Sequence, residues 1–405
     1  MTKTITVRES FDWITENDVT AQEYRELIRY VEEKYPDEFV LDQKYRRLRF
    51  INYVGVIQCS TIRYEVVPKV TISPMDDRKS LIKMLSVVKF FPISFYEQVQ
   101  NGEEQGSLLD AFLAAFVERL LQELKKGAYK TYERQEENLN MMRGKLELSK
   151  HVRMNAFQKT KAYCSFDEYR ENNTLNQLFK SALLIVRRYM ATSRLKLHLE
   201  RCLGYLENVD VVQFTPEKVN NIILNRQNER FEEATTFAKL IVERASIYSG
   251  GRSRSSFSFL FPMNLLFEKY IEVALREAAG TKEVISQHAE KRLLRNKRSG
   301  RDNILLKPDF VIDNKTIIDT KWKSATYDGR SQYVQSDIYQ MYAYVTAYKG
   351  VERCILLYPK QEGEAEHPVW EVIDTEKVIE MRAVRIDAFW ESVEELRGVL
   401  EGGEK

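Results

Sequence analysis

The sequence has few of the residues that build disulfide frameworks or zinc sites. Its 405 residues include only four cysteines and four histidines, all of them scattered along the chain. Cys59, Cys164, Cys202 and Cys354 form no C-x-x-C pair. This spacing argues against structural disulfides, zinc and histidine-based metal sites, and is typical of a protein from a reducing compartment.

Long apolar runs and nucleotide-binding loops are also missing. No apolar run reaches membrane-spanning length, and the first residues, MTKTITVRESFDWI, contain no apolar segment of a signal peptide. We therefore expect a soluble, cytoplasmic protein. The chain has no G-x-x-x-x-G-K-S/T motif, so it carries no P-loop of its own. The net charge is only +2, so a surface that binds nucleic acid must be local.

A chain of this length can form two or three domains, each with its own core. We expect an α/β (α+β) protein with a β-rich N-terminal domain over 1–107, a mostly helical middle region over 108–250 and a third domain over 251–405. The polar, glycine-containing stretches 101–107 (NGEEQGS) and 250–256 (GGRSRSS) mark the two boundaries.

Two local signals organise the N-terminal part. Thr20 and Glu23 have the spacing of a capping box at the start of a helix over 20–34. The stretch 48–70 is strand-like, and Gly55 inside it indicates a bulge or close packing.

The C-terminal part contains the stretch 304–323, ILLKPDFVIDNKTIIDTKWK. It predicts two strands, 305–312 and 316–322, joined by a turn at Asp313–Asn314. The elements between 262 and 358 follow the order helix-strand-strand-strand-helix-strand. This order predicts a mixed sheet flanked by helices.

Polar residues interrupt these two apolar strands. Asp309 follows Pro308 in the first, whereas Asp319 and Lys321 lie two apart, and so on one face, in the second. Two carboxylates suit a hard cation such as Mg²⁺, and the lysine would orient or help deprotonate a water that attacks a phosphodiester. The pattern Pro308-Asp309…Asp319-Thr320-Lys321 is that of the PD-(D/E)xK nucleases. A surface hairpin with solvated charges is the alternative, which the cost of unpaired charges in apolar strands disfavours.

Two helices beside these strands carry further candidates. In the helix over 262–280, Glu268 lies within an apolar stretch and could complete the oxygen shell of a metal. The other helix is expected to start at a Ser336 cap and to end at Gly350. Its Gln340 could hold a water or a phosphate. An ordinary boundary glutamate and a hydrogen-bonded core amide are the alternatives.

A basic segment precedes the first site strand. Residues 291–301, KRLLRNKRSGR, contain no acidic residue and six basic ones: Lys291, Arg292, Arg295, Lys297, Arg298 and Arg301. A basic loop beside a phosphodiester site would bind the DNA backbone without reading its sequence. The alternative is a loop that only adds solubility.

Several short segments together resemble the McrC family, the nuclease subunits of the McrBC 5-methylcytosine-dependent restriction system. They keep the family's order over most of the chain: YVGVI at 53–57, PK at 68–69, MRGK at 142–145, NTLN at 173–176, MNLLFE at 263–268, PD at 308–309, DTKWK at 319–323, DIYQM at 337–341 with Tyr344, and LYP at 357–359. Residues 71–107 and 215–260 match nothing in the family's pattern.

This resemblance implies a C-terminal PD-(D/E)xK endonuclease domain. In it Asp309 and Asp319 would bind Mg²⁺, Lys321 would be the catalytic lysine, and Glu268 and Gln340 would be auxiliary. The N-terminal part would bind a ring of McrB, an AAA+ GTPase, and stimulate GTP hydrolysis. McrB would read the methylated base in double-stranded DNA, and the complex would translocate before cutting. The missing P-loop agrees with this division of tasks.

Two other functions remain open. The first is a stand-alone DNA repair or processing nuclease, which the large N-terminal half disfavours. The second is a non-catalytic assembly factor with an inert nuclease fold, which the intact Asp309, Asp319 and Lys321 disfavour.

Overall fold

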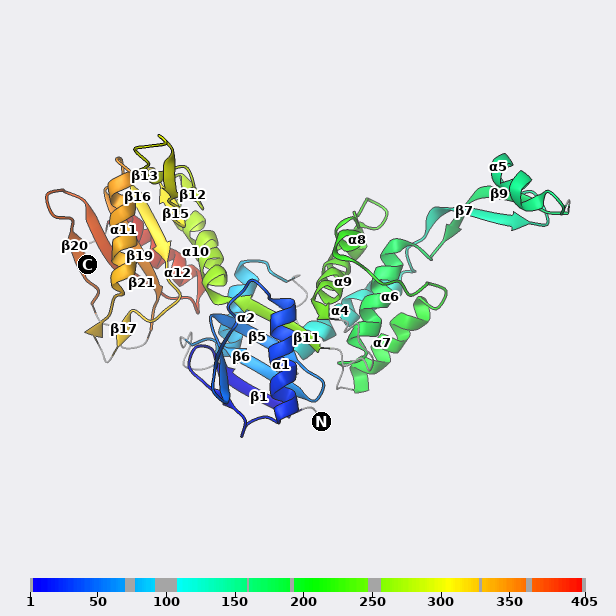
Figure 1. The fold of residues 1–405 in the computed structure, drawn as a ribbon, viewed down its shortest axis with the longest axis horizontal. Coiled ribbons are helices and arrows are strands. Elements are labelled where there is room, and N and C mark those ends of the chain that lie inside the picture. Colours follow the sequence, from blue (N-terminus) through cyan, green and yellow to red (C-terminus); the bar gives the residue numbers. More distant parts are fainter. Residues whose placement is uncertain are drawn as a thin grey trace. The chain divides into compact units, whose positions relative to one another are not determined.

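A computed structural model describes residues 3–69, 77–91, 108–158, 160–189, 193–246, 256–327, 330–361 and 366–402. The chain forms two compact units (Figure 1). We call residues 91–255 the inserted unit, and residues 2–90 together with 256–405 the split unit. The expected linkers at 101–107 and 250–256 lie outside the described residues, except for Ser256, which begins strand β11 (Ser256–Pro262).

The first sheet of the split unit joins the N-terminal segment to a strand from far along the chain. Four of its five strands lie in the order β1-β6-β5-β11, with β1 parallel to β6 and β5 antiparallel to both β6 and β11. They are β1 (Lys3–Arg8), β5 (Tyr53–Gln58), β6 (Ile62–Val67) and β11 (Ser256–Pro262). Strand β11 therefore pairs with β5, a strand that precedes the inserted unit.

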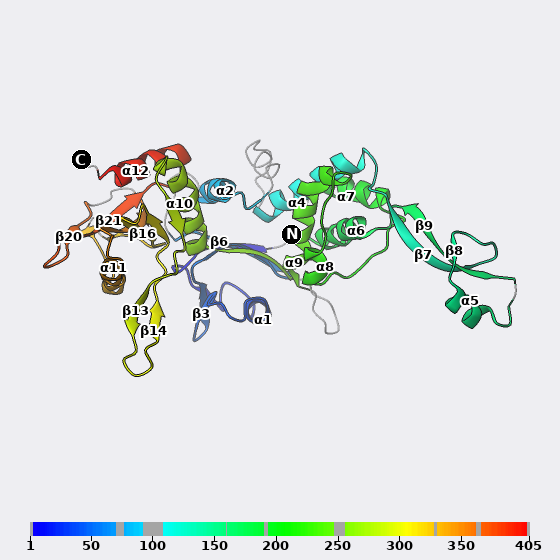
Figure 2. The same cartoon turned by 90° about the horizontal axis from the view of Figure 1, so that it is seen from above.

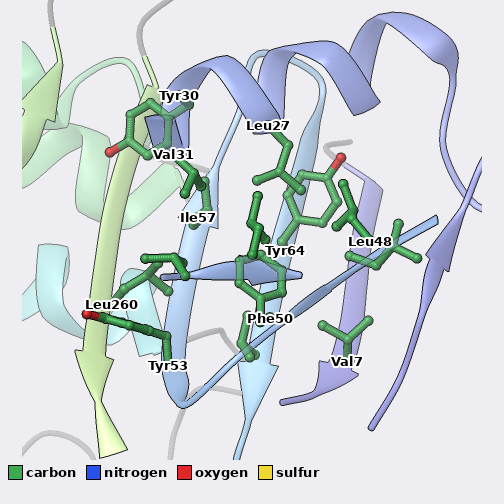
Figure 3. Close-up of a cluster of buried hydrophobic side chains, with 14 of the residues drawn as sticks. Val7, Leu27, Tyr30, Val31, Leu48, Phe50, Tyr53, Ile57, Tyr64 and Leu260 are labelled. Carbon is green, nitrogen blue, oxygen red and sulfur yellow. The ribbon is translucent and has the colours of Figure 1, made fainter. Parts of the chain in front are cut away.

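Helix α1 (Ala21–Lys34) covers one face of this sheet, where Leu27, Tyr30 and Val31 pack among buried strand residues such as Ile57 and Tyr64 (Figure 3). The remaining elements of the segment are β2 (Ile14–Thr15), β3 (Leu41–Lys44), β4 (Arg47–Phe50), which form a small separate sheet, and α2 (Asp77–Val87).

Both local signals of the N-terminal part are confirmed. The Thr20 hydroxyl accepts a hydrogen bond from the Glu23 backbone N–H, and the Glu23 carboxylate accepts one from the Thr20 N–H, which is a capping box. Gly55 has φ +129°, and a Cβ atom there would lie 1.8 Å from the carbonyl oxygen of Phe259. Glycine is therefore needed where β5 and β11 pair.

The inserted unit is mostly helical, as expected, but its β part is larger than the sequence predicts. The helices are α4 (Leu108–Leu124), α6 (Thr174–Val186), α7 (Ser193–Tyr205), α8 (Pro216–Asn220) and α9 (Glu232–Arg244), with a 3₁₀ turn at Glu229–Phe231 and a short strand β10 (Ala245–Ser246). An arm projects from them (Figure 2), built of β7 (Thr131–Leu139), β8 (Lys145–Leu146), α5 (Leu148–Asn155) and β9 (Ala162–Arg170).

The second sheet of the split unit is mixed, with the order β12-β15-β16-β19-β21-β20. Strand β15 is antiparallel to β16, which is parallel to β19. The strands are β12 (Val284–Ser286), β15 (Phe310–Ile312), β16 (Thr316–Thr320), β19 (Arg353–Pro359), β20 (Val369–Glu371) and β21 (Val378–Val384).

Helices cover both faces of this mixed sheet. Figure 2 shows α11 (Gln335–Ala347) on one face, and α10 (Met263–Ala279) and α12 (Phe389–Glu401) on the other. The predicted order of helices and strands between 262 and 358 is confirmed. Two hairpins are added to it: β13 (Arg292–Arg295) with β14 (Asp302–Leu305), and β17 (Thr326–Tyr327) with β18 (Arg330–Ser331).

The predicted bounds of the two site strands are wrong. The first strand does not run over 305–312, because β14 ends at Leu305 and β15 begins only at Phe310. Pro308 explains the break, since proline has no N–H to donate to a strand ladder. The second strand ends at Thr320, so Lys321 lies beyond its end.

Two further predictions of local structure are wrong. Helix α11 begins at Gln335 with Val334 as its N-cap, so Ser336 lies inside the helix and does not cap it. The basic segment 291–301 is not a loop. Its first half is β13, which pairs antiparallel with β14 through Arg292–Leu305, Leu294–Asn303 and Arg295–Asp302.

The compact units do not follow the three consecutive domains expected from the sequence. Residues 2–90 and 256–405 form one unit because β11 pairs with β5, whereas 91–255 fold separately. The binding of a partner by the N-terminal part and the nuclease activity of 251–405 stay predictions.

None of the helices among the described residues is both long and apolar enough to cross a membrane.

Candidate active site

Asp319 is the most buried charged group of the mixed sheet's candidate site. It lies on β16 between β15 and β19, and only 2% of it is exposed. The pKa of its carboxyl is raised to about 6, because burial and the nearby charge of Asp309 raise it by more than the ammonium of Lys321 lowers it. The charged form of Asp319 is therefore held at a cost, which a bound cation would reduce.

Lys321 lies between an acidic and an amide partner. Its Nζ forms an ion pair with Asp319 Oδ2 and donates to Gln340 Oε1 at 3.1 Å. Its backbone N–H donates to the carbonyl of Leu357 at 2.9 Å, so the main chain stays beside β19 after β16 has ended. The structure thus brings together three of the predicted site residues.

Tyr344 fixes the orientation of the Gln340 amide. Gln340 Nε2 donates to Tyr344 Oη at 2.7 Å, and Tyr344 in turn donates to the backbone carbonyl of Lys307 at 3.0 Å. With its amide nitrogen directed to Tyr344, Gln340 presents its oxygen to Lys321. The sequence pattern gives Tyr344 no site role, although it lies one helical turn from Gln340 on the same face.

Asp309 reaches the site from the residue that precedes β15. Its Oδ2 accepts hydrogen bonds from both the backbone N–H and the hydroxyl of Thr320, each at 2.7 Å. Thr320 directly follows Asp319, so this contact holds the two carboxylates near each other. Thr320 is the middle residue of the D-x-K pattern, and the pattern alone gives it no function.

Glu268 approaches from α10. Burial raises its pKa, and the charges of Asp309, Glu272 and Asp319 raise it further. Its carboxylate accepts a hydrogen bond from Gln287. Glu268 is therefore within electrostatic range of both Asp309 and Asp319. However, no group of three or more His, Cys, Asp or Glu residues in the described part of the chain is arranged to hold a metal ion.

The donor set nevertheless fits Mg²⁺. This ion usually keeps several waters and is bound through one or two carboxylates plus substrate phosphates, so a complete protein cage is not needed. Asp319 on β16 and Asp309 directly before β15 would supply two hard oxygen ligands. They are therefore the residues that would hold the ion.

The basic residues of 291–301 lie on the β13–β14 hairpin and are all exposed. Arg295 forms a two-bond ion pair with Asp302, at 2.6 and 3.2 Å, so part of its charge is neutralised. The turn is closed by Asn296, whose side chain accepts from the backbone N–H groups of Arg298 and Ser299. The turn therefore presents a basic surface, although not the predicted loop.

Comparison with known proteins shows a family and a fold. A family model described as McrBC 5-methylcytosine restriction system component matches residues 48–359. No curated protein sequence matches the chain.

Two solved structures are similar. One is a refined half-complex from a tetradecameric assembly of Thermococcus gammatolerans McrB AAA+ hexamers with bound McrC, with TM-score 0.74, 18% identity, and coverage of 99% of this chain and 100% of that chain. The other is the cryo-EM structure of the Thermococcus gammatolerans McrBC complex, with TM-score 0.53, 21% identity, and coverage of 68% and 88%. At these identities the likeness shows the fold alone. Because the family model spans most of its length, this chain belongs to the McrBC 5-methylcytosine restriction system component family, and its fold is McrC-like.

Proposed function

We propose that this chain is the endonuclease subunit of a 5-methylcytosine-dependent restriction complex, and that it hydrolyses DNA phosphodiester bonds with Mg²⁺. The observation that carries the proposal is the buried Asp319, held beside Lys321 and Gln340, with Asp309 hydrogen-bonded to the adjacent Thr320. The finer fold assignment, a PD-(D/E)xK endonuclease domain over 251–405, belongs to this proposal. Family membership supports the setting in a restriction system.

Each site residue has a proposed task. Asp309 and Asp319 would hold Mg²⁺, which when bound supplies charge stabilisation at the phosphodiester and lowers the pKa of a bound water. Lys321 would orient the attacking water or take its proton at Nζ. Gln340 keeps Nζ of Lys321 in place through its amide oxygen. Glu268 would act as an auxiliary carboxylate from α10.

The partner is proposed to be an McrB-like AAA+ GTPase ring, whose GTP hydrolysis this chain stimulates. A structure of McrB hexamers with bound McrC contains a chain that this one matches over its whole length. The absence of a P-loop from the sequence agrees with a nucleotide hydrolase on a separate chain. Double-stranded DNA would lie against the exposed basic residues of the β13–β14 hairpin.

The test is plasmid cleavage in the presence of Mg²⁺, with methylated and unmethylated DNA. Wild type and Asp309→Ala are each assayed with and without the McrB-like partner and GTP. We expect cutting only by wild type, and only with partner, GTP and methylation. Cutting by wild type alone would instead support a stand-alone nuclease. Equal cutting by Asp309→Ala would remove this site from the reaction, and an assembled complex that never cuts would support an assembly factor.

A further inference from the structure

A carboxylate from the N-terminal segment contacts the residue next to Lys321. Glu9 is completely buried, and its Oε1 accepts a hydrogen bond of 2.7 Å from the indole Nε1–H of Trp322. The two residues are 313 positions apart in the sequence. Trp322 is 5% exposed and directly follows Lys321. The contact therefore joins the first sheet of the split unit to the candidate active site.

The first sheet holds Glu9 rigidly. The backbone N–H of Glu9 donates to Val67 at 2.9 Å, which extends the pairing of β1 with β6 by one residue. The backbone N of Lys69 lies 3.5 Å from Glu9 Oε1, and Lys69 Nζ donates to the side chain of Asn52 at 2.7 Å. The carbonyl of Asn52 accepts from Met263, the first residue of α10. The residues that flank β1 and β5 therefore make two contacts. Glu9 contacts the chain after β16 through Trp322, and Asn52 contacts the first residue of α10, the helix that carries Glu268.

On the other side, Trp322 supports a segment that has left the sheet. Strand β16 ends at Thr320, and the last backbone hydrogen bond to β19 is that of Lys321 to Leu357. The indole of Trp322 packs at a tilt against Phe267 of α10, with ring centroids 5.6 Å apart. After this bond, the side chain of Trp322 anchors the segment next to Lys321, and the ion pair of Lys323 with Asp337 anchors it one residue later.

We propose that Glu9 is a positioning residue for the nuclease reaction. By holding the indole of Trp322, it fixes the backbone at Lys321, so that Nζ faces Asp319 and Gln340. The inference rests on the catalytic role proposed for Lys321. Adjacent residues are joined by a rigid peptide unit, so a shift of Trp322 moves Lys321 as well. A misplacement of about 1 Å at a reacting group can cost on the order of 100-fold in rate. The Pro68-Lys69 segment of the sequence pattern then has a task, because Lys69 compensates the buried charge of Glu9.

Three variants of the full-length chain, assayed with the partner, test this role. Glu9→Ala should lower the kcat of DNA cleavage about 10- to 100-fold at saturating DNA, with KM unchanged. Glu9→Gln keeps an oxygen acceptor for the indole and should stay within about threefold of wild type. Trp322→Phe keeps the ring contact with Phe267 but loses the N–H, and should resemble Glu9→Ala. The double variant Glu9→Ala/Trp322→Phe should be no slower than either single variant.

A measurement independent of cleavage reports the bond itself. Selective ¹⁵N labelling of tryptophan gives four indole signals, from Trp13, Trp322, Trp370 and Trp390, and the one that disappears in Trp322→Phe is assigned to Trp322. Its N–H should exchange slowly with solvent in wild type and Glu9→Gln, and at least about 10-fold faster in Glu9→Ala.

The outcomes separate this inference from the proposed function. If wild type does not cut and Asp319→Ala behaves identically, the proposed function fails, and the positioning role fails with it even where the indole is protected. If wild type cuts and Glu9→Ala keeps full kcat after losing indole protection, only the positioning role is overturned. If Glu9→Ala does not fold, Trp322→Phe tests the positioning role in its place. A wild-type kcat in Trp322→Phe would equally overturn that role.

Discussion

Asp319 shows how a single residue can be suited to a site and unfavourable for the fold. Its carboxylate is almost completely removed from water, and its pKa rises from 3.8 to about 6. Lys321 provides a compensating charge, but Asp309 adds a second negative charge. Near neutral pH the ionised Asp319 therefore lowers the stability of the folded state.

The first prediction concerns Asp319→Asn. A carboxyl with a raised pKa binds its proton more tightly in the folded state, so the stability of wild type falls as pH rises from about 4 to about 6. At pH 7.5, without divalent cations, Asp319→Asn should unfold with a free energy about 1–2 kcal/mol higher than wild type. At pH 5 the difference should shrink, because wild-type Asp319 is then mostly protonated. Urea denaturation at the two pH values measures both quantities.

The matched control for Asp319→Asn is the addition of Mg²⁺. The ion should stabilise wild type and leave the variant unchanged, because a ligand stabilises only the state that binds it. A variant less stable than wild type at pH 7.5 would contradict the cost assigned to the buried charge.

At the residue scale, the sequence predicts site residues that stand out from their neighbours, and it misses residues whose contacts depend on distant segments. Asp309, Asp319, Lys321 and Gln340 could be predicted because the charge pattern interrupts apolar strands and a helix at fixed spacing, and the structure brings these residues together. Their catalytic roles remain predictions. The contact of Glu9 could not be predicted, because it depends on how two distant segments pair.

At the scale of elements, the pairing of β5 with β11 depends on one glycine. The second prediction is that Gly55→Ala destabilises the split unit by about 3 kcal/mol or more, because the added Cβ would collide with the carbonyl of Phe259. The control is Gly398→Ala, on helix α12, where nothing lies within 4 Å of the added Cβ. That variant should be stabilised by about 0.5–1 kcal/mol. Thermal unfolding measures the change in stability of each variant. Equal changes in Gly55→Ala and Gly398→Ala would contradict the prediction.

The third prediction concerns the β13–β14 hairpin. Lys297→Gln/Arg298→Gln should weaken DNA binding and lower the slope of log affinity against log salt by up to about 0.9 for each phosphate that is no longer neutralised. The double variant Lys125→Gln/Lys349→Gln, with the same change of charge at exposed positions elsewhere, should keep the wild-type slope. DNA affinity measured over a range of salt concentrations gives both slopes. An unaltered slope in the hairpin variant would mean that the turn does not contact phosphate.

Elements can be predicted well where the signal is local, and poorly where it is not. The capping box at Thr20 and the close packing at Gly55 follow from neighbouring residues. The pairing of β13 with β14 escapes prediction, because six basic residues conceal the strand character of Arg292–Arg295. The break at Pro308 escapes it because apolar residues lie on both sides of the break, at 304–306 and at 310–312.

For the whole molecule, the fourth prediction is a separation of activities. Lys321→Ala should abolish DNA cleavage, because the site loses its only ammonium partner of Asp319 among the described residues. Binding to the McrB-like partner and stimulation of its GTPase should persist, since the N-terminal part is proposed to perform them. Cleavage and GTPase assays on the same preparation test this. Loss of both activities in a folded variant would contradict the separation.

The fifth prediction concerns fragments. Residues 256–405 expressed alone should be poorly soluble, because β11 loses its partner strand and Trp322 loses Glu9. Co-expression of 1–90 with 256–405 should yield a soluble pair that co-purifies, while 91–255 should fold without either. A soluble 256–405 fragment with the unfolding midpoint of the full chain would contradict this dependence.

The late arrival of β11 has a consequence for biosynthesis. All residues of β5 are buried in the finished sheet, yet its partner strand leaves the ribosome about 200 residues later, roughly 10–40 s at ordinary rates of elongation. Throughout that interval β5 can pair only with β6, and its other edge stays unpaired, which is the kind of edge on which chains aggregate. The inserted unit can fold during the same interval. Translation speed and chaperone supply between codons 60 and 256 should therefore govern how much active protein a cell obtains.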